Sequence, residues 1–177
     1  PILKAQNHEI SSLSEKIDGA DKEAFLEMFE RFQIYVESKF DLEDFDLNGQ
    51  VPYPARLRYI IDRKKTMIGI VLAVLNGARP SVLMELHYEG TACSQSFGEV
   101  GLSENVFEAE ALLSANLNSL IANIEKLHTL RLNEEGILLV QQVWRQFRDA
   151  FAEFLFRVSN GSFSKDIWLL WLTELRA

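Results

Sequence analysis

Apolar side chains that recur at helical spacing constrain the fold of this chain more than any other feature of its sequence. In residues 21–40 they stand three or four positions apart, and the charged side chains fall largely on the opposite face. The apolar set comprises Phe25, Met28, Phe29, Phe32, Val36 and Phe40. The pattern predicts an amphipathic helix that buries a Phe-rich face.

Helix signals also mark five other parts of the chain. Pro54 suits the first turn of one helix. Glu134 and Glu135 suit the first turn of another, which the stop signal Asn160-Gly161 would end. We therefore expect further helices within residues 1–19, 54–75, 104–128, 133–159 and 164–177.

Three stretches leave room for β-structure. Residues 82–97 contain alternating apolar and polar side chains before Glu89-Gly90, which predicts one small antiparallel β-hairpin. Residues 66–75 are largely apolar and rich in β-branched side chains, so a buried strand competes there with the end of a helix. A hairpin that turns at Glu135-Gly136 is a further alternative to helix.

The length and composition of the chain fit one domain. A chain of 177 residues can bury a sizeable core without disulfides, and its 47% hydrophobic content argues against disorder. We expect residues 1–177 to form a mainly α fold, a single-domain helical bundle of five or six helices with one small β-hairpin. The alternative is an α+β fold with a central antiparallel sheet in residues 66–97.

Charge and apolar run length limit the classes of partner. The net charge of -8 repels phosphate backbones, so we do not expect the chain to bind nucleic acid. The longest apolar run, Met67–Leu75, has nine residues, whereas a membrane helix needs about 20. We therefore expect no membrane span. The single cysteine, Cys93, and a start without export-signal features point to the cytoplasm.

The acidic segment Asp44–Val51 resembles the first eight positions of an EF-hand calcium loop. Its oxygen-bearing residues alternate, and Gly49 stands where the loop must turn. Ala55, however, occupies the twelfth position, where the family requires a bidentate Glu. A calcium-binding helix-loop-helix is therefore an alternative function, and an acidic inter-helix loop is favoured.

No sequence motif indicates catalysis. Glu125 and His128 have the spacing of a di-iron ligand pair, but no second pair accompanies them. In the expected hairpin, Cys93 and His87 fall on opposite faces, which disfavours a Cys-His dyad. We therefore assign no catalytic residue, no metal ligand and no cofactor. A small enzyme or ligand-binding protein whose site is invisible in the sequence stays an alternative.

The last predicted helix carries an unusually wide apolar stripe. Ile167, Leu170 and Trp171 belong to this stripe, and Trp168 with Leu172 widens it beyond what a surface helix needs to cover a core. One interpretation is that these side chains bind a partner. The other is that the terminal helix buries both tryptophans inside the domain.

A basic cluster at residues 56–65 stands out in an acidic chain. Arg56 and Arg63 lie two helical turns apart on one side of the predicted helix, so an acidic partner segment could dock there. The alternative is a solvated face that balances nearby carboxylates.

These observations favour binding over chemistry. The chain is expected to be a non-catalytic protein-binding module, that is, an adaptor, a regulator or a small acidic chaperone-like protein that uses helical apolar surfaces. Its partner would be another protein or, in a dimer, a second copy of itself.

Overall fold

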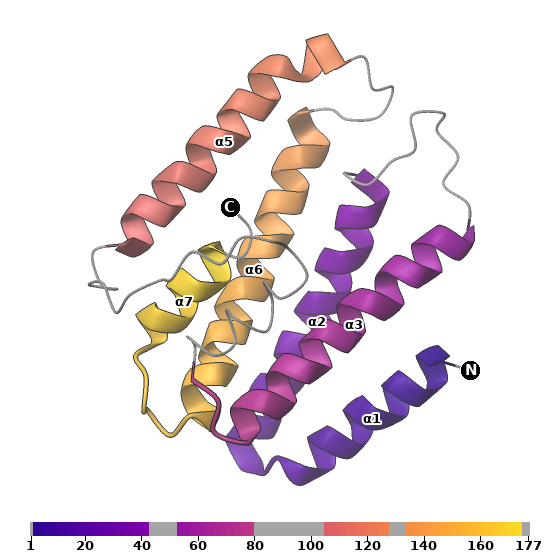
Figure 1. Cartoon of the computed structure of the whole chain (residues 1–177), viewed down its shortest axis with the longest axis vertical. Helices are drawn as coiled ribbons and strands as arrows, with labels where there is room; N and C mark the ends of the chain where they lie inside the picture. Colours follow the sequence, from indigo (N-terminus) through magenta and orange to yellow (C-terminus); the bar gives the residue numbers. More distant parts are fainter. Residues whose placement is uncertain (1, 43–52, 80–104, 128–133, 175–177) are drawn as a thin grey trace.

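The computed structural model describes residues 2–42, 53–79, 105–127 and 134–174. Within these ranges the chain forms six helices and no strand (Figure 1). The helices are α1 (Ile2–Lys16), α2 (Gly19–Leu42), α3 (Tyr53–Leu75), α5 (Asn105–Leu127), α6 (Glu134–Val158) and α7 (Lys165–Glu174).

The mainly helical class is confirmed, and two of the β-alternatives are wrong. Residues 66–75 complete α3, so a central sheet that begins there does not form. Gly136 is buried within α6, which excludes a hairpin turn at that position. In both segments the apolar side chains join a helical face that the rest of the bundle covers, and this burial outweighs local β-propensity. The expected β-hairpin at residues 82–97 lies outside the described residues.

The pair α2 and α6 forms the centre of the bundle. These two helices make the most extensive helix-to-helix contact among the described residues, with α1 and α3 on one side and α5 and α7 on the other (Figure 1). Aromatic rings line the seam between them. Phe25 packs on Phe154 with ring centroids 5.4 Å apart, and Phe32 packs on Phe147 at the same distance. The Phe-rich face predicted for residues 21–40 is thus the buried face of α2.

One apolar cluster links all six helices. Its buried members include Ile10 from α1, Met28 from α2, Val71 from α3, Leu113 from α5, Phe151 from α6 and Trp168 from α7. Because each helix contributes to the same cluster, the packing of one element depends on the position of its neighbours.

The turn between α6 and α7 is set by local chemistry. Asn160 and Gly161 have positive φ values of 50° and 68°, which confirms the predicted stop signal. The Ser164 hydroxyl accepts a hydrogen bond from the backbone N–H of Ile167, as an N-cap residue does. Lys165 and Arg157 both bind Glu153, and the hydrogen bonds from first Lys165 and then Arg157 lower the pKa of that carboxyl. The turn directs α7 back along α6.

Both tryptophans of α7 belong to the core. The exposed fraction is 0% for Trp168 and 3% for Trp171. The two indole rings meet edge to face with centroids 6.0 Å apart, and Trp171 also contacts Phe151 of α6. The helix is buried on most of its circumference because α5 and α6 both pack on it. Two neighbours therefore account for the wide apolar stripe.

This packing predicts a large stability effect at Trp168. Replacing Trp168 with Ala removes a fully buried indole, so the free energy of unfolding should fall by about 3–5 kcal/mol. The matched control is Leu26→Ala on the exposed face of α2, which should change it by about 0.5 kcal/mol or less. Urea denaturation followed by circular dichroism measures both. An equal effect of the two substitutions would contradict the core assignment.

Candidate functional site

The residues that the sequence suggested for partner binding at the C-terminus face inward. Trp168, Trp171 and Leu172 are all buried by the chain's own helices. In this conformation they offer almost no side-chain surface to another molecule. The core interpretation of the apolar stripe therefore accounts for them, and a partner would reach them only if α7 left the bundle.

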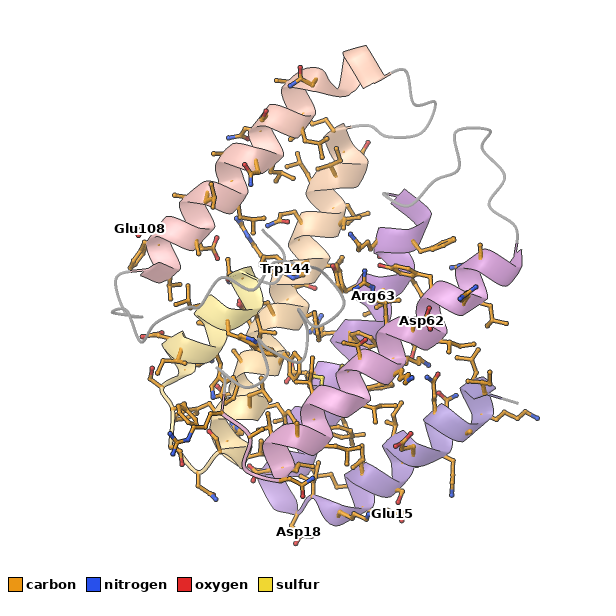
Figure 2. The ribbon with its side chains drawn as sticks, viewed as in Figure 1. Glu15, Asp18, Asp62, Arg63, Glu108 and Trp144 are labelled. Atoms are coloured by element: carbon orange, nitrogen blue, oxygen red, sulfur yellow. The ribbon has the colours of Figure 1, made fainter. Side chains whose placement is uncertain are left out.

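The basic cluster of α3 lies against the chain's own groups. The guanidinium of Arg56 lies over the ring of Phe40 at 5.9 Å, and that of Arg63 lies over Tyr59 at 5.1 Å. Arg63 is next to Asp62 on α3 (Figure 2). These contacts agree with a solvated face whose cations pack on aromatic rings. They give no indication of an anion site.

Lys64 is the buried member of this cluster. Its ammonium group donates a hydrogen bond to the side-chain oxygen of Asn7, 3.1 Å away, and lies 5.7 Å from the ring of Phe29. Burial lowers the pKa of Lys64, and the carboxylate of Glu37 offsets part of that effect. Lys64 thus connects α1, α2 and α3 at one point.

Several sequence-based candidates fall outside the described side chains. They are the calcium-like segment Asp44–Val51, the Cys93 and His87 pair, and the Glu125 and His128 pair. Among the side chains that are described, no group of three potential metal ligands comes together. In the same part of the chain, no helix is long and apolar enough to cross a bilayer.

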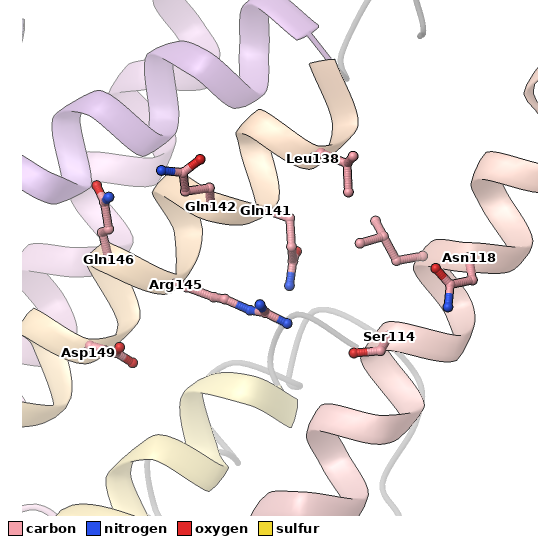
Figure 3. A pocket seen from close by; sticks show the side chains of 9 residues that line it. Ser114, Asn118, Leu138, Gln141, Gln142, Arg145, Gln146 and Asp149 are labelled. Carbon is pink, nitrogen blue, oxygen red and sulfur yellow. The ribbon is translucent and has the colours of Figure 1, made fainter. Parts of the chain in front are cut away.

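An open groove lies between α5 and α6 and is lined by described residues of both helices (Figure 3). Its volume is about 350 Å³. From α5 it is lined by Ser114, Leu117 and Asn118, and from α6 by Leu138, Gln141, Gln142, Arg145, Gln146 and Asp149. The side chain of Arg145 extends from α6 into the space between the two helices (Figure 3). Sequence reasoning had not identified this site.

The groove follows from the different lengths of the helices. α7 has 10 residues and α5 has 23, so α7 spans about 15 Å along a helix of about 35 Å. α5 packs mainly on α7 and makes fewer contacts with α6. Beyond the reach of α7, no third helix among the described residues lies between α5 and α6. The leucines along this part of α5 stay accessible.

Two stretches beside the groove lack charge and carry exposed leucines, whereas Arg145 and Asp149 in its lining are charged. No charged residue occurs between Ala111 and Asn123 of α5, or between Gly136 and Trp144 of α6. The exposed apolar side chains of these two stretches are Leu112, Leu120, Leu138 and Leu139. Of these leucines Leu138 lines the groove, together with the half-buried Leu117, and apolar side chains in an open recess are typical of a contact site for another molecule.

The buried side chain of Arg148 lies at the end of the groove that is next to α7. Arg148 of α6 donates hydrogen bonds to Glu110 of α5 and to the hydroxyl of Thr173 on α7, 3.3 Å away. Its Nε donates to Asp149, and its guanidinium lies over the ring of Trp144 at 5.1 Å. Trp144 lies near the middle of α6 (Figure 2). One guanidinium thereby joins three helices, and it sets the distance between α5 and α6 where α7 ends.

Comparisons of the chain with protein-family models, with curated proteins and with solved structures found no match. Function is therefore argued from the geometry of the groove and its surroundings.

The sequence did hold a signal for this site. Charged residues make up 25% of the chain, yet thirteen consecutive positions of α5, residues 111–123, carry none. Hydrophobic periodicity identifies the helix but does not show which of its faces stays uncovered. The position of α7 decides that, and it follows from tertiary packing.

The two arginines that bind Glu110 provide a matched pair for testing the Arg148 contacts. The side chain of Arg148 is 10% exposed and that of Arg145 is 47% exposed. Arg148→Ala should lower the free energy of unfolding by about 2–4 kcal/mol, because it removes a partly buried ion pair with Glu110, the hydrogen bond to Thr173 and the packing on Trp144. Arg145→Ala should cost about 1 kcal/mol or less. Chemical denaturation measures both values, and similar losses would show that burial does not set the strength of these pairs.

The buried ammonium of Lys64 predicts a pH dependence. Because its pKa is lowered in the folded protein, the unfolded chain binds this proton more tightly. Stability should therefore rise as pH increases from the lowered pKa to the ordinary value of 10.5. Urea unfolding at several alkaline pH values should show this gain for the parent relative to Lys64→Met. The exposed neighbour Lys65, changed to Met, is the control, and equal pH profiles for the two variants would refute the prediction.

Proposed function

We propose that this chain is a non-catalytic protein-binding module that receives a helix of another protein in the groove between α5 and α6. An adaptor, a regulator or a small chaperone-like protein would use such a surface. The single cysteine fits action in the cytoplasm. The observation that carries the proposal is an open groove lined by Leu117, Leu138 and amide side chains, beside uncharged stretches of α5 and α6.

The dimensions of the groove suit a helix. The uncharged stretch of α5 covers thirteen residues, or about 20 Å, which matches a partner helix of about four turns. Leu117 of α5 and Leu138 of α6 offer apolar contacts from the two sides. An amphipathic helix placed between two helices presents side chains at i, i+3 or i+4, and i+7 to such a groove. The bundle would then gain the packing that α7 is too short to provide.

The polar lining supports recognition of a specific partner. Gln141, Gln142 and Asn118 surround the apolar contacts with amide groups. Amides donate and accept hydrogen bonds without the high desolvation cost of charged groups. An interface with an apolar centre and polar surroundings is typical of specific protein complexes.

The test compares two double variants, each of which replaces two apolar side chains with Gln. The groove variant is Leu117→Gln/Leu138→Gln, and the control variant is Leu26→Gln/Ile34→Gln on α2. Leu138 is 46% exposed and Leu26 is 49% exposed, so the substitutions disturb solvent contact to a similar degree. Circular dichroism and urea denaturation establish that both variants fold.

A partner is first captured from a native lysate and identified by mass spectrometry, and its affinity is then measured with purified proteins. The parent and the control variant should bind it equally, and the groove variant should bind at least about tenfold more weakly. Binding should slow amide hydrogen exchange in a helical segment of the partner. The proposal would be refuted if the groove and control variants bind the partner with equal affinity. It would also be refuted if the partner slows hydrogen exchange on a face of this chain other than the groove.

A further inference from the structure

We infer that the helix received by the groove is cationic, with Lys or Arg at the end that lies beside the start of α6. This inference rests on the proposed function and adds the charge and the direction of the partner. It follows from the distribution of carboxylates at the two ends of the groove.

One end of the groove is acidic. Glu134 and Glu135 open α6, and both are exposed. They precede Leu138 by four and three positions, so they lie one helical turn from a residue that lines the groove. A helix lying along Leu138 therefore brings its own end close to two carboxylates.

The other end of the groove is electrically balanced. Glu110 and Asp149 are the carboxylates there, and Arg148 bonds to both. Arg145 pairs with Glu110 at 3.4 Å. Two negative and two positive groups therefore meet at this end, and they satisfy each other. Among the charged side chains that the structure describes at the two ends of the groove, Glu134 and Glu135 at the start of α6 are those available to a ligand.

A second copy of the chain fits this groove less well than a cationic partner. Each chain has a net charge of -8, so two copies repel each other at long range. A basic helix is attracted both by the whole acidic protein and by Glu134 and Glu135 in particular. Charge complementarity thus selects a positively charged helix from another protein.

The experiment uses a library of 16-residue amphipathic helices displayed on phage. Positions on one face vary among apolar residues, and the terminal turn at each end is fully randomised. The full chain is the bait, and Leu117→Gln/Leu138→Gln is the bait for counter-selection, so only peptides that need the groove survive. The selected peptides should carry Lys or Arg in one terminal turn several times more often than the input library.

The affinities of selected peptides then test the acidic end. Glu134→Gln/Glu135→Gln should weaken binding about three- to tenfold at low ionic strength. The control is Glu23→Gln/Glu30→Gln on the exposed face of α2, which changes net charge equally and should have a much smaller effect. Added salt should reduce the difference between these two variants.

Each other result overturns part of the argument. Groove-dependent peptides without a cationic end, or equal effects of the two Glu variants, would refute the charge inference and leave protein binding in place. If light scattering detects a dimer of the parent chain but a monomer of the groove variant, the occupant of the groove is a second copy. An absence of groove-dependent peptides, together with unchanged partner binding by the groove variant, would refute both proposals.

Discussion

The seam between α2 and α6 is the interaction on which the other helices depend. Its phenylalanines pack as tilted and stacked pairs, from Phe25 with Phe154 to Phe32 and Tyr35 with Phe147. Aromatic pairs of this geometry bury large areas and restrict how two helices can slide past each other. With this pair fixed, α1 and α3 can cover one side while α5 and α7 cover the other. The shape of the candidate groove is a consequence of how completely that second side is covered.

α7 covers only part of that side, and the Arg148 contacts mark its limit. α7 packs on both α5 and α6 as far as Thr173, where Arg148 connects the three helices, and this packing buries Trp168 and Trp171. A buried cation of this kind tolerates few alternative arrangements, because each donor requires an acceptor in place. The same contacts therefore hold α5 beside α7, and no other described helix covers the remaining length of α5 on this side. Arg148 therefore belongs both to the packing around α7 and to the end of the open groove.

Much of the fold could be predicted from the sequence, whereas the candidate site could not. The Phe spacing of residues 21–40 and the stop signal at Asn160-Gly161 act locally, so they were readable without tertiary information. The ambiguity of residues 66–75 was different in kind, because a short apolar run fits a buried helix or a buried strand until its neighbours are known. Trp168 posed the same problem for function: a wide apolar stripe fits a partner surface or two covering helices, and the positions of α5 and α6 distinguish them.

The contrast between α2 and α5 gives the groove its significance. Both helices expose some apolar side chains, but Leu26 of α2 stands next to Glu27 and close to Glu23 and Glu30. Such isolated apolar residues are ordinary on protein surfaces. On α5, by contrast, Leu117 lines the groove within a stretch without a single charge, and Leu138, which is 46% exposed, lines it from α6. The charged side chains in the groove lining are Arg145 and Asp149, and they pair with Glu110 and Arg148 respectively. A helix laid in the groove would cover Leu117 and Leu138, and the uncharged positions beside them hold no carboxylate that would have to lose water on binding.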